Sequence, residues 1–252
     1  DTVFLSIDLA GEKIFEHKIE RKQTLFSLAQ FYGLSVEELY FYNPELKEKS
    51  VSPGQGVQVP IPNRAIIRYK DKNFKIWKYA PVYYIVKKGD TMFRISKVHF
   101  RMPVDSIMQR NGLQSETLKV GQCLHVGWIS LDGVPEEFRS EGGNPLARKN
   151  GALLKLFVRE QGDRKVQEHQ GVAYWQKDSK EDSDLYALHR EARINSIISV
   201  LNPMNKSIIY VKVIGKIPDT AYGNDVVVVL SPMAAKALGA RDPRFFVKVK
   251  YY

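Results

Sequence analysis

The stretch QTLFSLAQFYGLSVEELYFYNPEL, residues 23–46, decides the fold of the first half of the chain. Apolar residues recur in it at helical spacing, and Ser35 with Glu38 forms a capping box for a second helix. Short strand-like runs stand on either side of it, at 18–20 and 57–60. This order predicts a strand, two helices and a closing strand.

The same pattern occurs again in DTMFRISKVHFRMPVDSIMQRNGL, residues 90–113. Thr24 corresponds to Thr91 at a spacing of 67 residues, and Val36 corresponds to Val104 at a spacing of 68. The second copy therefore carries one extra residue between these positions. Both copies close alike, with PGQGVQVP and VGQCLHVG. The first half is predicted to contain two copies of one small module.

Both copies resemble the LysM module, over 17–61 and 83–128. The resemblance implies a βααβ fold that binds chains containing N-acetylglucosamine, such as peptidoglycan or chitin. In that family the sugar lies between the loop before the first helix and the loop after the second. The glycan-binding residues that it implies are Gln23, Thr24, Leu25, Asn43, Pro44 and Leu46 in the first copy, and Gly89, Asp90, Thr91, Met92, Asn111, Gly112 and Leu113 in the second.

The two copies differ in the loop before the first helix. The second copy keeps the family's Gly-Asp-Thr sequence at 89–91, whereas the first has Lys-Gln-Thr at 22–24. An acetamido sugar needs small polar partners for its amide and an apolar wall for its methyl group and ring face. The threonines and asparagines also have a structural interpretation, as helix caps and helix stops. Both interpretations stay open.

The segments around the modules have their own predictions. Residues 1–16 are predicted to form a hairpin, and 62–82 are predicted to form strands that pack the two modules together. Residues 129–169 are rich in polar and turn-forming residues near their start and are predicted to be a linker region. Within it, 153–158 is undecided between strand and helix. Cys123 lies in an apolar run and is predicted to be buried.

The last part of the chain, 170–252, has a β pattern. Short apolar runs separated by turn signals predict several strands, and Ser231 followed by Pro232 predicts the start of one small helix. Residues 226–230, VVVVL, are apolar throughout and predict a strand that is buried on both faces. Several short strands with a single small helix predict a compact barrel.

This order resembles the double-psi β-barrel of rare lipoprotein A, through GVAYW at 171–175, LYALH at 185–189 and VVLSPMAAKALGA at 228–240. Some members of that family are lytic transglycosylases that act on peptidoglycan. The resemblance implies catalytic roles for His189 and, by position, Asp178. The family's aspartate position holds Gly215, and Asp219 lies four residues further on.

Composition restricts the partners. The chain has 252 residues and a formal net charge of +10, which favours an anionic partner. Its basic residues are spread widely and no nucleic-acid motif is present, so no nucleic-acid partner is expected. The densest basic stretch, YKDKNFKIWKY at 69–79, predicts a strand with one solvated face, or a surface that stacks on rings.

No run reaches the roughly 20 apolar residues of a transmembrane helix. The five histidines show no metal-ligand spacing, so neither a metal nor another cofactor is expected.

Together these features predict an α+β protein of two LysM modules and a small double-psi barrel. The predicted function is peptidoglycan binding without cleavage, because glycine at position 215 has no carboxyl group to transfer a proton. Two alternatives remain: a lytic transglycosylase that uses His189 with Asp219 or Asp178, and a structural envelope protein that binds a protein partner. The expected location is the periplasm, the outer membrane or the exterior, with a signal peptide already removed.

Overall fold

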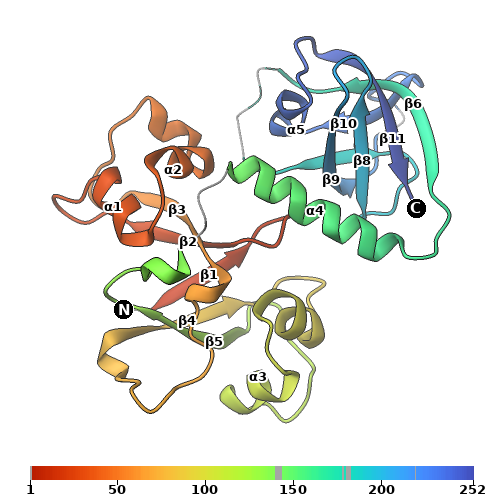
Figure 1. The fold of residues 1–252 in the computed structure, drawn as a ribbon. Helices are drawn as coiled ribbons and strands as arrows, with labels where there is room; N and C mark the ends of the chain where they lie inside the picture. Colours follow the sequence, from red (N-terminus) through yellow and green to blue (C-terminus); the bar gives the residue numbers. More distant parts are fainter. Residues whose placement is uncertain (1, 140–143, 178, 180–182, 219) are drawn as a thin grey trace. The chain divides into compact units, whose positions relative to one another are not determined.

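The computed structural model describes residues 2–139, 144–177, 179, 183–218 and 220–252. It divides the chain into two compact units, Asp1–Gly142 and Gly143–Tyr252. Unit 1 combines a sheet with short helices, and unit 2 is a closed barrel with two helices (Figure 1). The predicted α+β class is confirmed.

Unit 1 is built on one five-stranded sheet with the order β3-β2-β1-β4-β5. Its strands are β1 (Val3–Ile7), β2 (Lys13–Lys18), β3 (Gly56–Ile61), β4 (Tyr79–Ile85) and β5 (Cys123–Ser130). Strand β2 pairs antiparallel with β3, and β4 pairs antiparallel with β5, so each repeat has its own strand pair. Strand β1 lies between the pairs, antiparallel to β2 and parallel to β4. The N-terminal strand therefore joins both repeats into one sheet.

Each repeat places two helical segments between its strands. The first repeat has α1 (Leu25–Tyr32) and α2 (Val36–Tyr42), followed by the 3₁₀ turn η1 (Pro44–Lys47). The second has the π-helical segment η4 (Arg94–Phe100) and α3 (Val104–Arg110). Reciprocal capping boxes at Thr24 and Ser35 start α1 and α2. The predicted strand–helix–helix–strand order is confirmed in both copies.

The extra residue of the second repeat is absorbed in its first helix. Helix α1 ends at Gly33, whose φ of 68° lies in the left-handed region. The equivalent helix ends at Arg101, φ 52°, one residue later, after η4 has widened into π-helical hydrogen bonding. A π turn accommodates one more residue than an α turn. Tyr32 and its counterpart Phe100 are therefore both buried.

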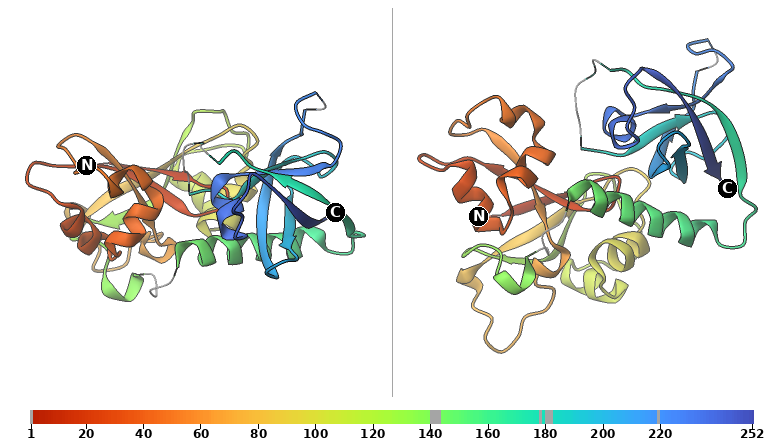
Figure 2. Two further views of the ribbon diagram at one scale, coloured as in Figure 1. Left: turned by 90° about the horizontal axis from the view of Figure 1, so that it is seen from above. Right: turned by 45° about the horizontal axis from the view of Figure 1, so that its top comes forward.

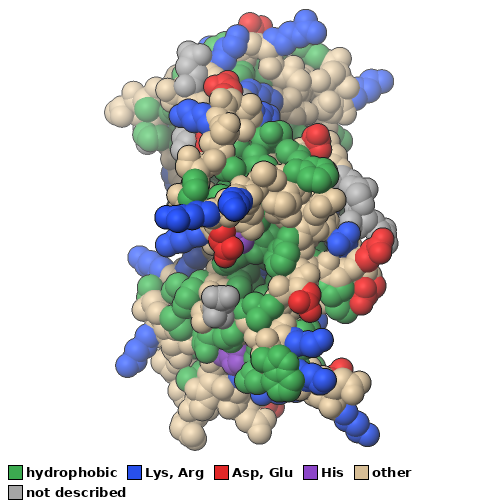
Figure 3. Space-filling view, turned by 90° about the vertical axis from the view of Figure 1, so that its left-hand side faces the viewer, with side chains coloured by type: hydrophobic (Ala, Val, Ile, Leu, Met, Phe, Trp, Pro, Cys, Tyr) green, Lys and Arg blue, Asp and Glu red, His purple; other side chains and the backbone are tan. Residues whose placement is uncertain are grey.

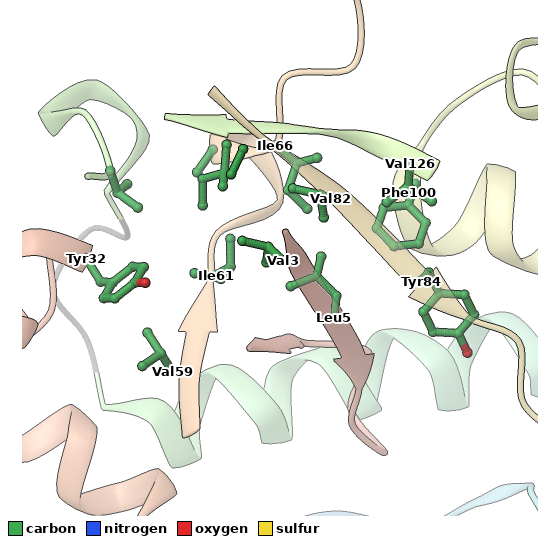
Figure 4. Packing of buried hydrophobic residues seen from close by; sticks show 14 of the residues in the cluster. Val3, Leu5, Tyr32, Val59, Ile61, Ile66, Val82, Tyr84, Phe100 and Val126 are labelled. Atoms are coloured by element: carbon green, nitrogen blue, oxygen red, sulfur yellow. The ribbon is translucent and has the colours of Figure 1, made fainter. Parts of the chain in front are cut away.

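One hydrophobic core serves both repeats (Figure 4). Alternate residues of β1, Val3 and Leu5, are buried in it, whereas Phe4 between them lies on the opposite face of the strand. The labelled core residues come from β1, from both repeats and from the connecting segment: Val3, Leu5, Tyr32, Val59, Ile61, Ile66, Val82, Tyr84, Phe100 and Val126. The two repeats therefore pack as one unit.

The segment between the repeats differs from its prediction. Strands were expected over 62–82, but only the part from Tyr79 onward is a strand, β4. The rest contains the 3₁₀ turns η2 (Asn63–Ala65) and η3 (Ile76–Lys78) and one isolated bridge, Ile67–Trp128. Asp71 accepts a hydrogen bond from the Asn73 N–H at 2.8 Å, which favours a turn over an extended strand.

Cys123 is exposed, so the prediction that it is buried was wrong. The residue begins β5, and side chains alternate between the two faces of a strand. Leu124 and Val126 face the core, which places Cys123 on the other face.

Unit 2 contains a closed six-stranded barrel with the order β10-β6-β11-β8-β9-β7. Pairs β10–β6 and β7–β9 are parallel, and the other neighbours are antiparallel. Helix α5 (Pro232–Ala237), capped by Ser231, follows β10 (Figure 2). The strands are β6 (Gln167–Tyr174), β7 (Tyr186–His189), β8 (Ile197–Asn202), β9 (Ser207–Gly215), β10 (Val226–Leu230) and β11 (Arg244–Tyr251).

The predicted linker region, 129–169, is largely ordered structure. After the 3₁₀ turn η5 (Glu136–Phe138) it contains α4 (Pro145–Gln161), which contacts β8 and β9. Leu153 and Phe157 bury one stripe of the helix, while Leu154 and Val158 in the same run are exposed, so the short run at 153–158 did not reveal the period. The part with η5 therefore belongs to unit 1, and the part with α4 belongs to the barrel unit.

A buried lysine fastens α4 to the barrel unit. Lys149 is almost completely buried, and its Nζ donates to the Ser183 carbonyl at 2.9 Å and pairs with Asp184 Oδ1 at 3.1 Å. We expect Lys149→Ala to lower the free energy of unfolding by about 2–4 kcal/mol, because it leaves buried polar groups without their donor. Urea denaturation measures this loss. Lys155→Ala, at an exposed position of the same helix, is the control, and equal losses in both variants would contradict the role of Lys149.

Candidate functional site

The Gly-Asp-Thr loop of the second repeat is held by Asp90. Its Oδ2 accepts hydrogen bonds from the Tyr84 hydroxyl at 2.6 Å and from the Lys87 N–H at 2.7 Å. Gly89 takes the left-handed conformation with φ +88°, and Thr91 Oγ1 accepts from the Arg94 N–H at 3.2 Å. Burial and the bond to Asp90 raise the pKa of Tyr84, which keeps it a donor. The motif is therefore a scaffold for the loop.

The first repeat builds the same loop with other side chains. Gln23 Oε1 accepts from the Glu20 N–H at 3.1 Å and lies 2.8 Å from His17 Nε2, at the positions equivalent to Asp90, Lys87 and Tyr84. Lys22, φ 68°, occupies the left-handed position of Gly89. The His17–Gln23 pair thus replaces Tyr84–Asp90, and the missing Gly-Asp pair does not remove the loop's internal bonds.

The two asparagines that were predicted as ligand contacts or helix stops have an internal role. Asn43 Nδ2 donates to the Leu39 and Gln58 carbonyls, both at 2.8 Å, and its Oδ1 accepts from the Gln58 N–H at 2.7 Å. Asn111 repeats these three bonds with Ile107 and His125, at 2.8, 3.1 and 2.7 Å. Each asparagine therefore ties the end of its second helix to the closing strand.

The other predicted glycan residues vary in access. The side chains of Asn43, Leu46 and Met92 are buried. Partly buried positions are Gln23, Leu25, Pro44, Asp90, Asn111 and Leu113. Exposed positions are Thr24, Gly89, Thr91 and Gly112. The surface available at these loops is therefore formed by the threonines, the glycines and the exposed edges of the partly buried residues.

Two aromatic residues beside these loops were not selected from the sequence. Phe26 and Phe93 occupy equivalent positions in the first turn of the first helix of each repeat, two residues after the capping threonine. Their exposed fractions are 63% and 61%. The sequence did contain a signal for them: phenylalanine occurs in both repeats at a position that the helical spacing places outside the buried stripe.

In the barrel, His189 is buried and neutral. It is 1% exposed, and its Nδ1 accepts from the N–H groups of Glu191 at 3.1 Å and Ala192 at 2.9 Å. The proton therefore lies on Nε2, which has no hydrogen-bond partner within the described part of the chain. Burial, with the nearby His169 and Lys216, lowers the pKa of His189 to about 4.

Three further side chains gather beside His189. The Tyr251 hydroxyl donates to Glu191 Oε2 at 2.5 Å, and the Tyr251 ring lies 4.7 Å from the His189 ring between centroids. His169 Nδ1 lies 3.7 Å from Glu191 Oε1. Burial and the bond to Glu191 raise the pKa of Tyr251. We call His169, His189, Glu191 and Tyr251 the histidine cluster. Pairing of β6 with β11 brings His169 and Tyr251 together, and no local motif marks the cluster.

Of the three predicted catalytic residues, the structure describes His189. Asp178 and Asp219 lie outside the described residues, so no argument rests on their geometry. Gly215 ends β9 and pairs with Leu188, directly before His189. A Cβ built at position 215 would lie 3.1 Å from Leu188 Cδ2 and would meet only the end of that flexible side chain. Position 215 itself therefore supplies no carboxylate next to Leu188 and the strand that carries His189.

The described residues contain no group of three His, Cys, Asp or Glu side chains placed to hold a metal ion. None of their helices has the length and hydropathy needed to cross a bilayer.

Comparison with known proteins supports the interpretation of the repeats. Residues 17–60 and 84–127 match the family model of the LysM domain, so the chain contains two LysM domains and a closed barrel. No curated protein matches. Among solved structures, the crystal structure of the Bacillus cereus spore cortex-lytic enzyme SleL is 25% identical, over 45% of this chain and 22% of that chain, with a TM-score of 0.20. A TM-score this low gives the likeness no weight.

The asparagine bonds predict a stability effect in each LysM domain. Asn43→Ala and Asn111→Ala should each lower the free energy of unfolding by about 2–3 kcal/mol, because buried backbone groups lose their partners. Thermal and urea denaturation measure this loss. Asn73→Ala, an exposed asparagine in the same unit, should change stability by less than about 0.5 kcal/mol. Losses below that size in both Asn43→Ala and Asn111→Ala would contradict the role of the asparagines.

The buried neutral histidine predicts a pH dependence. Its folded-state pKa of about 4 lies below the usual histidine pKa of 6.5, so the unfolded chain binds more protons between these values. The contribution of neutral His189 to the free energy of unfolding of the barrel should therefore be fully present above pH 6.5. It should fall by about 3 kcal/mol as the pH drops to 4. His189→Asn keeps an acceptor near the Nδ1 position but does not titrate. Urea denaturation across this range should show a smaller fall in the variant, and equal falls would contradict the assignment.

Proposed function

We propose that the protein binds N-acetylglucosamine-containing glycan strands of peptidoglycan through its two LysM domains and does not cleave them. LysM domains imply this class of ligand. The loop of the first repeat extends the proposal to both domains. Its His17–Gln23 pair reproduces the bond between Tyr84 and Asp90 in the second repeat. A cell-envelope or extracellular location is part of the proposal.

The proposed contacts lie at the loops before the first helices and after the second. Thr24 and Thr91 offer hydroxyl groups at the surface, while Asn43 and Asn111 hold the opposite loop in place. The exposed ring of Phe26 or Phe93 supplies an apolar face for a sugar ring. Of the predicted residues, Gln23, Asp90 and the asparagines therefore act mainly by positioning.

The shared sheet strengthens this proposal. Both LysM domains lie within unit 1 and share one core, so their spacing is fixed. Two sites at a fixed spacing on a repeating polymer convert the second binding event into an intramolecular one. The positive charge of the chain favours approach to an anionic wall.

Binding to purified wall sacculi tests this function. The full chain should co-sediment with sacculi, and Phe26→Ala and Phe93→Ala should each weaken binding about 2- to 10-fold through loss of an apolar contact. The double variant should lose more than either single one. Phe246→Ala removes an exposed aromatic ring of the barrel and serves as the control. Wild-type protein that stays in the supernatant would overturn the proposal and leave the alternative of an envelope protein with a protein partner.

Cleavage by the barrel is the second candidate function. It rests on the resemblance to rare lipoprotein A and on Glu191, whose carboxylate accepts from Tyr251 beside His169 and His189. One carboxyl group can serve as acid and then base in this chemistry. Release of anhydro-muropeptides from sacculi, lost in Glu191→Gln, would establish cleavage. Co-sedimentation without release supports binding alone, which Gly215 favours.

A further inference from the structure

An exposed loop of unit 1 combines apolar and basic side chains. Residues 69–78, called the basic tip below, expose Trp77 by 71%, Ile76 by 61% and Tyr69 by 56%. The same ten residues contain four exposed lysines and one aspartate, so their formal charge is 4 − 1 = +3. The lysines are Lys70, Lys72, Lys75 and Lys78.

The basic tip is anchored to the sheet rather than free. Phe74 stacks on Tyr79 with ring centroids 4.7 Å apart and packs against Trp128 at 5.2 Å. Lys70 Nζ lies over both the Phe74 and Trp128 rings, at 5.4 and 5.0 Å. Phe74 thus faces inward, while Ile76 and Trp77 form the outer part of the 3₁₀ turn η3. The exposed apolar pair is presented on a supported turn.

This combination fits the surface of an anionic bilayer. Tryptophan prefers the membrane–water interface, aliphatic side chains enter the boundary of the acyl chains, and lysines attract anionic headgroups. We propose that the basic tip docks on membranes that contain anionic lipid, with Trp77 and Ile76 inserted and the lysines among the phosphates. Figure 3 shows hydrophobic and basic side chains side by side on one face of the molecule.

A glycan strand fits the basic tip less well. A sugar ring stacks on Trp77, but Ile76 offers no ring face and four lysines have no counterpart on a neutral sugar. An anionic polymer without an apolar part would attract the lysines but leave Ile76 and Trp77 in water. Only a partner with both anionic groups and an apolar boundary satisfies the charge and the apolar pair together.

Vesicle binding by the full chain tests the proposal. The chain should co-sediment with vesicles of equal parts phosphatidylcholine and phosphatidylglycerol, and not with phosphatidylcholine alone. Of the three tryptophans, Trp77 is exposed, whereas Trp128 and Trp175 are buried. Tryptophan fluorescence should therefore shift to shorter wavelength on binding. About 1 M salt, where the Debye length falls to about 3 Å, should weaken the binding.

Variants separate insertion from charge. Trp77→Ala should weaken binding at least about tenfold and abolish the fluorescence shift, and Lys72→Gln with Lys75→Gln should weaken it about 30-fold. Met204→Ser, which removes an exposed apolar side chain of the barrel, is the control. All positions are exposed, and circular dichroism should show unchanged folding.

Three outcomes would overturn the proposal: no binding to anionic vesicles, equal binding by Trp77→Ala and wild type, or loss of sacculus binding rather than vesicle binding in Trp77→Ala. The last outcome would make the tip a glycan contact. Because the LysM loops are unchanged in these variants, failure of vesicle binding leaves the proposed glycan function standing.

Discussion

One strand, β1, holds the first unit together. Without it, each repeat would be a two-stranded sheet with two short helices and open strand edges. Strand β1 pairs with β2 on one side and β4 on the other and places Val3 and Leu5 in the common core. Three or more strands with a buried face are needed for independent stability. The spacing between the two LysM domains therefore depends on a strand that lies outside both of them.

The two LysM domains show that one loop can be built with different chemistry. Tyr84 and Asp90 hold the second loop, while His17 and Gln23 hold the first. The first pair is itself supported by Tyr32, whose hydroxyl lies 3.1 Å from His17 Nδ1; the second repeat has Phe100 at that place and no such bond. The replacement is thus a coordinated change of three positions, and a single motif is a poor guide to whether the loop is formed.

The barrel unit brings several polar side chains together around His189. His189 accepts two backbone hydrogen bonds, is buried and stays neutral, which suits a structural centre better than a proton carrier. Lys216, next to Gly215, donates to the carbonyls of Glu191 and Ala192 at 2.8 and 2.9 Å and closes the turn after His189. The carboxylate of Glu191, bonded to Tyr251, lies beside this turn with His169.

Local patterns were sufficient to predict the repeats, because helix caps at Thr24 and Ser35 and the helical spacing of Leu25 and Leu28 act over a few residues. The closed barrel was also predictable from short apolar runs. Helix α4 was not, because its buried stripe of Leu153 and Phe157 has meaning only against β8 and β9.

Sequence alone thus determined the α+β class, the two LysM domains and a barrel. Tertiary structure decided that β1 joins the domains, that Asn43 and Asn111 point inward, and that His169, Glu191 and Tyr251 meet His189, because each of these depends on contacts between residues far apart in the chain.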